Sequence, residues 1–325
     1  MPPAILKRTL PTAVVAFGLG LAATLGLAAT PVLAVETFSA KALIEGTVAT
    51  AMQCALIKHA VYVTAEGESI CIRYYTGGQP LTGTTPAVFI TGDVLGTDGH
   101  GHLVADPGYL TGAPDYLEIA ARVWTERLKT PVIFFARMGM HGSSGWHGNR
   151  RTALEIGITR AALDAIKAKE GIAGFHLVGQ SAGGMLAEAV AATRNDVGCL
   201  VLASTPSDFA QFTKRFGITL KTSGKFAHYL PMADVGSIAA KPDMRIIALT
   251  DPKDTVVPPP IQTRFIEALR AAGKPVLALQ TEARGVEHHA LIEKALFVTG
   301  MCVAGDSDAA IVGAYGGTAA EALPK

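Results

Sequence analysis

The segment Gly179-Gln180-Ser181-Ala182-Gly183 constrains the fold of this chain more than any other. It follows an apolar, strand-like run at 175–178 and leads into a helix-like stretch at 184–192. A serine at the apex of a strand–turn–helix is exposed, as a nucleophile must be. A Cβ atom at 179 or 183 would collide with backbone in so sharp a turn, which explains the two glycines. The position of the motif between a strand and a helix, more than its residue pattern alone, predicts that Ser181 is a nucleophile.

Buried strands alternate with amphipathic helices along most of the chain. Apolar runs predict strands at 61–63, 70–75, 87–90, 131–136, 175–178, 199–203, 245–249 and 276–280. Helical periodicity predicts helices at 115–129, 153–169, 184–192, 260–272 and 289–298. This alternation predicts an α/β fold, with a mostly parallel sheet covered by helices on both faces. The less regular residues 205–243 form a short insertion after the sixth of these strands.

The N-terminal residues have the pattern of an export signal. Lys7 and Arg8 precede an uncharged stretch at 10–33, and Val32-Leu33-Ala34 fits a signal-peptidase site. An uncleaved membrane anchor is the alternative, but the Gly, Thr and Pro residues within the stretch favour cleavage. We therefore expect a signal peptide at 1–34, a periplasmic or secreted protein, and no stable membrane partner after cleavage.

Charge and cysteine content narrow the class further. The formal net charge is +1 and no basic run is long, so nothing indicates a nucleic-acid partner. The four cysteines fit two disulfides in an exported protein, although four free thiols are an alternative. Cys54 and Cys71 lie on neighbouring β-like segments, and Cys199 and Cys302 lie at the opposite edge of the sheet from Ser181. We expect these two pairs, one of three possible connectivities.

A serine nucleophile needs a base, and the base needs a third group to orient it. Asp254 and Asp251 both follow the strand at 245–249, and the Asp-Pro step after Asp251 favours a turn role there. Asp254 is therefore the preferred acid, Asp251 the alternative and Asp208 a third candidate. His288 and His289 follow the last strand, and either can be the base.

The motifs together resemble the α/β-hydrolase superfamily. The resemblance rests on Gly-Gln-Ser-Ala-Gly at 179–183, Asp-Thr-Val-Val-Pro at 254–258 and the late histidine pair. Residues 137–145, Arg-Met-Gly-Met-His-Gly-Ser-Ser-Gly, are similar to a loop of its bacterial prolyl-oligopeptidase-like and dienelactone-hydrolase-like branch. The resemblance covers about 46–302 and implies Asp254 as the acid. Between the histidines it slightly favours His289.

The same resemblance implies a site that stabilises an oxyanion. One donor is the backbone N–H of Ala182, and the other comes from the loop after the strand at 87–90. Many relatives have His-Gly there, whereas this chain has Thr91-Gly92-Asp93. The second donor is then the N–H of Asp93 or Val94. The implied domain spans 35–304, with a small cap-like insertion at 205–243 and a flexible tail at 305–325.

A metal site and rival serines are the main alternatives at this sheet edge. His100, His102, His141 and His147 lie in two glycine-rich loops, and Asp93, Asp98 and Asp106 lie nearby. These residue types bind zinc, but their spacing matches no fixed motif, and we expect neither a metal nor another cofactor. Ser143 and Ser144 are not at an elbow and are expected to be loop or substrate-contact residues.

The sequence thus predicts an exported serine hydrolase acting on a small-molecule acyl substrate. Carboxylic esters are the expected substrates, because the insertion at 205–243 is too short for a large lid. Its aromatic residues either line an acyl pocket or pack the insertion onto the core. A peptidase or amidase of the same fold is the first alternative. A non-catalytic binding protein on the same scaffold is the alternative from another class.

Overall fold

The structure is a computed structural model that describes residues 37–98, 100, 102–217 and 225–316. These belong to one compact unit, residues 36–325. The expected signal peptide at 1–34 lies outside the described residues. No helix of the described part is long and apolar enough to cross a membrane.

The described residues form an eight-stranded sheet with the strand order β1-β2-β6-β3-β7-β8-β9-β10. The strands are β1 (Ala60–Ala65), β2 (Glu68–Thr76), β3 (Ala87–Ile90), β6 (Val132–Phe135), β7 (Phe175–Gln180), β8 (Val197–Ala203), β9 (Arg245–Thr250) and β10 (Val276–Gln280). Strand β2 is antiparallel to both β1 and β6, and all the other neighbours are parallel. The mostly parallel sheet expected from the sequence is confirmed.

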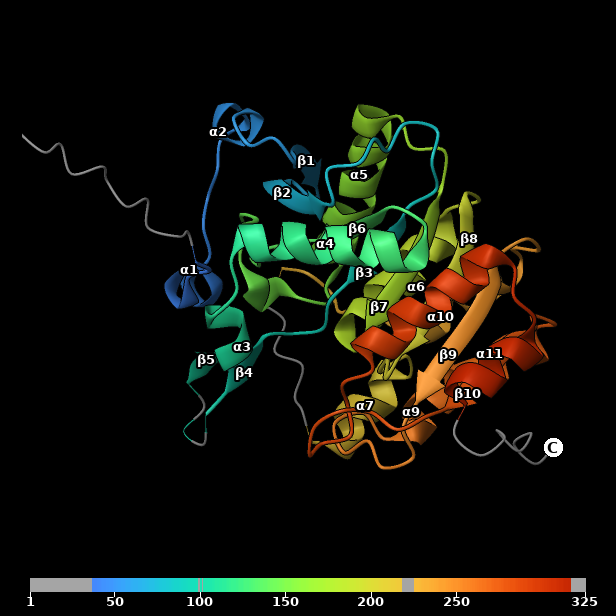
Figure 1. The fold of residues 1–325 in the computed structure, drawn as a ribbon. Helices are drawn as coiled ribbons and strands as arrows, with labels where there is room; N and C mark the ends of the chain where they lie inside the picture. Colours follow the sequence, from blue (N-terminus) through green and yellow to red (C-terminus); the bar gives the residue numbers. More distant parts are fainter. Residues whose placement is uncertain (1–36, 99, 101, 218–224, 317–325) are drawn as a thin grey trace, which may run out of the picture. The chain divides into compact units, whose positions relative to one another are not determined.

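Helices cover both faces of this sheet (Figure 1). The longer ones are α4 (Pro114–Leu128), α5 (Ala153–Glu170), α6 (Ala182–Thr193), α9 (Pro259–Ala271) and α10 (Ile292–Ala304). Side chains of α5, α6 and α9 share one core cluster with the sheet. Those of α4 and α10 share a second cluster on the opposite face. This two-sided burial explains why the strand sequences are almost continuously apolar.

Shorter elements lie mostly in the connections. They are α1 (Ala40–Glu45), α2 (Ala51–Ala55), the hairpin strands β4 (Leu95–Thr97) and β5 (Leu103–Ala105), α3 (Pro107–Leu110) and the 3₁₀ helix η1 (His147–Asn149). The insertion after β8, the sixth strand of the sheet in chain order, contains α7 (Phe209–Arg215), η2 (Pro231–Asp234) and α8 (Val235–Ala239).

Two local expectations need correction. The β-like segment predicted to hold Cys54 is the helix α2, which Thr50 and Gln53 begin with a capping box. The tail expected to be loose from 305 contains the helix α11 (Asp308–Tyr315), whose N-terminus is capped by Ser307. Its Ile311 is buried, so packing against the core stabilises a helix that the Gly- and Ala-rich composition concealed.

Both expected disulfides are present. Cys54 on α2 is bonded to Cys71 on β2, and Cys199 on β8 is bonded to Cys302 on α10. The first joins the α2 segment to β2, the strand beside the edge strand β1, and the second joins helix α10 to the inner strand β8. They close chain separations of 17 and 103 residues.

The sheet topology gathers the predicted site residues at one edge. Ser181 follows β7, Asp254 follows β9 and His289 follows β10. The loop that contains Asp93 and Val94 follows β3. Because these strands are parallel, their carboxyl ends meet at the same edge, where α/β proteins bind their ligands.

Candidate active site

Ser181 lies at a strained turn between β7 and α6. Its backbone has φ 54° and ψ −127°, a conformation that costs a non-glycine residue about 1–3 kcal/mol. The turn is held by two backbone hydrogen bonds: Ser181 N–H donates to Ala203 O at 2.8 Å, and Gly184 N–H donates to Ser181 O at 2.9 Å. Backbone bonding therefore offsets the strain and presents the serine at the sheet edge.

The two glycines of the motif are required by close backbone contacts. A Cβ atom at Gly183 would lie 2.1 Å from the carbonyl oxygen of Ile90. One at Gly179 would lie 2.5 Å from Cα of Gly184. Neither position has room for a side chain, which confirms the steric reason inferred from the sequence.

His289 is hydrogen-bonded to Asp254. Its Nδ1 lies 2.8 Å from Oδ2 of Asp254, whose side chain is almost completely buried. The other carboxylate oxygen of Asp254 accepts the backbone N–H groups of Val256 and Val257 at 2.9 and 2.8 Å. With Nδ1 bound to the carboxylate, Nε2 of His289 is the nitrogen left to take a proton.

His288 forms a separate pair with Asp251. Its Nδ1 lies 3.0 Å from Oδ2 of Asp251. Burial alone would raise the pKa of Asp251, but hydrogen bonds from Ala283 N–H, Lys253 N–H and His288 hold it below its ordinary value. The two acids and two histidines left open by the sequence are thus sorted by the structure into two distinct pairs.

Gln180 connects the elbow to the histidine loop. Its side-chain Nε2 donates to the carbonyl oxygen of His289 at 2.9 Å, and its Oε1 accepts the N–H of Leu291 at 3.1 Å. The residue directly before Ser181 therefore holds the backbone on both sides of Ala290. The G-x-S-x-G motif leaves this position open, so the sequence alone indicates no role for Gln180.

The loop after β3 lies directly against Ser181. A Cβ atom at Gly92 would come within 3.1 Å of Cβ of Ser181, so only glycine fits easily. The next residues are Asp93 and Val94, the expected oxyanion donors. Neither donates its backbone N–H to another of the described residues. Ala182, the other expected donor, is the first residue of α6, where backbone N–H groups have no partner within the helix.

The side chain of Asp93 is bound by three arginines. Oδ1 lies 2.9 Å from Nη1 of Arg137, while Oδ2 lies 2.8 Å from Nη1 of Arg151 and 3.2 Å from Nε of Arg150. Burial would raise the pKa of Asp93, but the charges of Arg151 and Arg137 hold it well below its usual range. The carboxylate is therefore ionised and fully engaged with guanidinium groups.

Arg137 connects this loop to helix α5. It is completely buried and makes a two-fold ion pair with Glu155, with both N–O distances at 2.9 Å. Its Nη1 also donates to the carbonyl oxygen of Thr91 at 3.2 Å. Arg137 thus holds the turn at 91–93 from both ends. The sequence marked residues 137–145 but gave Arg137 no role, since its partners come from separate segments.

Comparisons with known proteins bear on the fold. No family model and no curated protein matches the chain. Among solved structures, it is similar to an esterase of Pyrococcus furiosus, with 14% identity, a TM-score of 0.51 and coverage of 83% of this chain and 96% of the esterase. A puromycin hydrolase gives 17% identity and a TM-score of 0.53, over 77% of this chain and 40% of that one. A puromycin-hydrolysing peptidase of Mycobacterium tuberculosis is 18% identical with a TM-score of 0.52, and the match covers 77% of this chain and 39% of the peptidase.

The chain has the α/β-hydrolase fold. The resemblance drawn from the sequence is thereby confirmed at the level of fold, and the similar structures include both esterases and peptidases. The predicted catalytic and oxyanion-binding residues all follow strands β3, β7, β9 and β10, and so lie at the carboxyl edge of the parallel strands.

The hydroxyl groups of Ser143 and Ser144 are used in hydrogen bonds within the fold. Both are buried. The hydroxyl of Ser143 accepts Arg73 N–H and donates to Ala136 O, both at 2.9 Å. The hydroxyl of Ser144 accepts Cys71 N–H at 2.8 Å. Their hydrogen bonds fasten residues 136–144 to strand β2, so a substrate-contact role does not fit them.

The loop histidines that were metal candidates do not form a ligand cluster among the described residues. His102 bonds Asp98, whereas His141 is buried and packs against Phe38 and Tyr109. Burial, with the nearby charge of Arg137, lowers the pKa of His141 to about 4. Among the described residues, no group of three or more His, Cys, Asp or Glu side chains is placed to hold a metal ion.

Proposed function

We propose that this protein is a serine hydrolase that cleaves carboxylic esters. The observation that carries the proposal is the hydrogen bond between His289 and Asp254, on a loop that Gln180 ties to the elbow of Ser181. A nucleophile, a base and an orienting carboxylate are the three roles that acyl transfer requires. Asp254 and His289 are the assigned acid and base, and Asp251 with His288 form a supporting pair.

The mechanism follows from these assignments. Ser181 Oγ attacks the acyl carbon while His289 Nε2 takes its proton, and Asp254 stabilises the resulting imidazolium. The backbone N–H of Ala182, with that of Asp93 or Val94, stabilises the negative oxygen of the tetrahedral intermediate. His289 then protonates the leaving alcohol, and water activated by the same base releases the acid. No metal or cofactor takes part in this scheme.

We propose esters over peptides as substrates because of how much of each similar structure this chain matches and because its insertion after β8 is short. The Pyrococcus furiosus esterase is matched over 96% of its length, whereas the puromycin hydrolase is matched over 40%. The insertion after β8 is short and adds only α7, η2 and α8 among its described residues. An esterase consisting of one α/β domain fits both observations, and a peptidase or amidase is the alternative for the experiment to decide.

Export is part of the same proposal. The leader-like residues 1–34 and the two disulfides are typical of a protein that folds in the periplasm or outside the cell. The catalytic domain is proposed to begin at residue 35 and to include helix α11, whose Ile311 is buried.

A fluorophosphonate probe tests the assignment of Ser181. We expect one adduct, on Ser181, in the folded wild-type protein, and none in Ser181→Ala. Ser143→Ala is the matched control and should label like the wild type. A panel of p-nitrophenyl esters and aminoacyl amides then tests the bond cleaved. Absence of labelling and of turnover would instead favour a non-catalytic binding protein, while amide turnover exceeding ester turnover would favour a peptidase.

A further inference from the structure

Two arginines are bound to the loop that lies against the proposed nucleophile. A Cβ atom at Gly92 would lie 3.7 Å from Oγ of Ser181, and Asp93 is the next residue. The carboxylate of Asp93 binds Arg150 through Nε at 3.2 Å and Arg151 through Nη1 at 2.8 Å. One peptide bond and one ion pair therefore connect the residue beside the serine to each of these guanidinium groups.

The ion-pair cluster around Asp93 has an excess of positive charge. Three arginines, Arg137, Arg150 and Arg151, face the two carboxylates of Asp93 and Glu155. Burial, with repulsion from the other two arginines, lowers the pKa of Arg151 in spite of both carboxylates. The positive charge of the cluster is therefore incompletely compensated.

Arg150 and Arg151 also have unused hydrogen-bond donors. Arg150 binds Asp93 through Nε alone, and its Nη1 and Nη2 donate to no other described residue. Nε of Arg151 is buried and lacks a hydrogen-bond partner among the described residues. The two side chains are 20% and 18% exposed, so each is partly accessible to solvent. Planar guanidinium donors match the oxygens of a carboxylate.

The fold holds Arg151 in a strained conformation. Its φ is 59°, which costs a non-glycine residue about 1–3 kcal/mol. Its backbone N–H donates to Oε2 of Glu155 at 2.6 Å. Its guanidinium carbon lies 5.1 Å from the ring centre of Phe209 on α7. The side chain therefore contacts both the loop after β3 and the insertion after β8.

The strand order separates these arginines from the acids of the two histidine pairs. Strands β3 and β6 lie on one side of β7, whereas β8, β9 and β10 lie on the other. Asp251, Asp254 and His289 follow β9 and β10. Because His289 protonates the leaving alcohol in the proposed mechanism, the alcohol part of an ester lies on the histidine side. The acyl part is then the one that extends toward the arginines.

We propose that Arg150 and Arg151 bind an anionic group on the acyl part of the substrate. The inference rests on the proposed ester hydrolysis and adds the substrate class, which is half-esters of dicarboxylic acids. Arg137 is already occupied by Glu155, Asp93 and the carbonyl oxygen of Thr91. The contact with the anion is therefore made by the other two arginines.

Matched pairs of esters test this charge preference. Monoethyl succinate, adipate and suberate are each compared with the neutral ethyl ester of the same chain length, by measuring ethanol release. Wild-type kcat/KM should favour the anionic ester at least about tenfold at the length that reaches the arginines. Raising the salt concentration from about 0.05 M to about 0.5 M should weaken the preference, because salt screens partly exposed charges.

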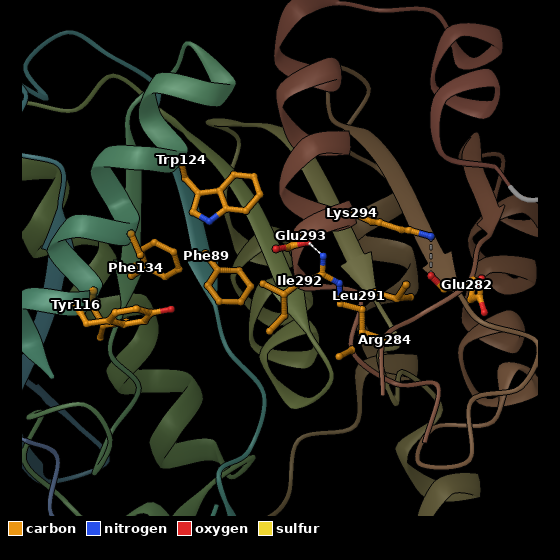
Figure 2. Close-up of a pocket in the computed structure, with 13 residues that line it drawn as sticks. Phe89, Tyr116, Trp124, Phe134, Glu282, Arg284, Leu291, Ile292, Glu293 and Lys294 are labelled. Carbon is orange, nitrogen blue, oxygen red and sulfur yellow. Dashed lines mark hydrogen bonds and ion pairs between the residues drawn. The ribbon is translucent and has the colours of Figure 1, made fainter. Parts of the chain in front are cut away.

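Variants locate the preference. Arg150→Gln should lower the ratio of anionic to neutral kcat/KM by about tenfold, and Arg150→Lys should retain part of it because the charge remains. The matched control is Arg122→Gln, which removes the same charge from an exposed position on α4. That helix borders a cavity on the other face of the sheet (Figure 2), so the control should keep the wild-type ratio.

Moving the charge to the alcohol part tests the orientation of the substrate. Carboxymethyl hexanoate should not be preferred to its neutral counterpart carbamoylmethyl hexanoate, and a preference there would overturn the acyl assignment. Equal kcat/KM for anionic and neutral ethyl esters at every length would overturn the anion site, while turnover of the neutral esters leaves the hydrolase function standing. An equal loss of preference in Arg150→Gln and Arg122→Gln would also overturn the site. Loss of all ester turnover and of Ser181 labelling in the wild type would overturn both proposals.

Discussion

Gln180 donates a hydrogen bond from its side-chain amide to the backbone carbonyl of His289 at 2.9 Å. It also accepts the N–H of Leu291, so the elbow itself sets the position of the proposed base. The side chain of Gln180 thereby links the turn that holds the proposed nucleophile to the loop that holds the proposed base.

Replacing Gln180 should impair catalysis without removing any reacting group. We expect Gln180→Leu to lower kcat by about ten- to a hundredfold with little change in KM, because small displacements of a catalytic group are costly. Gln180→Glu keeps the acceptor for Leu291 N–H but loses the donor to His289 O, and an intermediate loss is expected. Steady-state kinetics on p-nitrophenyl acetate measures both. If Gln180→Leu kept the wild-type kcat, the hydrogen bonds from Gln180 to His289 and Leu291 would have no catalytic role.

The adjacent histidines provide an internal comparison. His289→Ala should lower kcat by at least about 10³-fold, because the proton acceptor is lost. His288→Ala should lower it by less than about tenfold, since its partner Asp251 keeps hydrogen bonds from Ala283 and Lys253. The reverse order of the two effects would transfer the role of base to His288 and that of acid to Asp251.

The sequence predicts those parts of the site that depend on neighbouring residues, and not those that depend on contacts between segments far apart in the chain. The elbow, the strands and the order of acid and histidine are local patterns, and the structure bears out the strands and the steric need for the glycines at 179 and 183. The pairing of Asp254 with His289 depends on how two loops fold against each other. Chain periodicity carries no information on that.

Short helices and buried polar clusters were harder to predict. The capping residues Thr50 and Ser307 were signals for α2 and α11, but each helix is too short for its periodicity to be seen. The contacts of Arg137 join its own segment to two others, the turn that holds Thr91 and Asp93 and the helix that holds Glu155. Only tertiary packing brings those partners together, so no sequence motif could have identified them.

Arg137 is expected to be essential for stability. Arg137→Met leaves the buried carboxylate of Glu155 without its charged partner and with only the backbone N–H of Arg151, which should lower the free energy of unfolding by about 3–5 kcal/mol. Urea unfolding followed by fluorescence measures the loss. The double variant Arg137→Met/Glu155→Leu should recover part of it, because the orphaned charge is then removed. A double variant as unstable as the sum of both single changes would contradict this explanation.

Glu188 should make stability depend on pH in the neutral range. It is fully buried in α6, where it accepts a hydrogen bond from Ser207 at 2.5 Å. Its Oε2 has no hydrogen-bond partner among the described residues. Burial, with a smaller contribution from the charge of Asp234, raises the pKa of Glu188 from 4.5 to about 8. Between these pH values the folded protein retains a proton that the unfolded chain has lost. The free energy of unfolding should therefore fall as pH rises from about 4.5 to about 8.

The neutral isostere tests this directly. Glu188→Gln cannot ionise, so its free energy of unfolding should vary less with pH, and relative to the wild type it should gain stability between pH 5 and pH 9. Glu267→Gln changes an exposed glutamate on α9 and should reproduce the wild-type pH profile. Urea unfolding of the three proteins at pH 5, 7 and 9 gives the comparison. Parallel pH profiles for wild type and Glu188→Gln would mean that Glu188 is ionised in the fold and that another group compensates its charge.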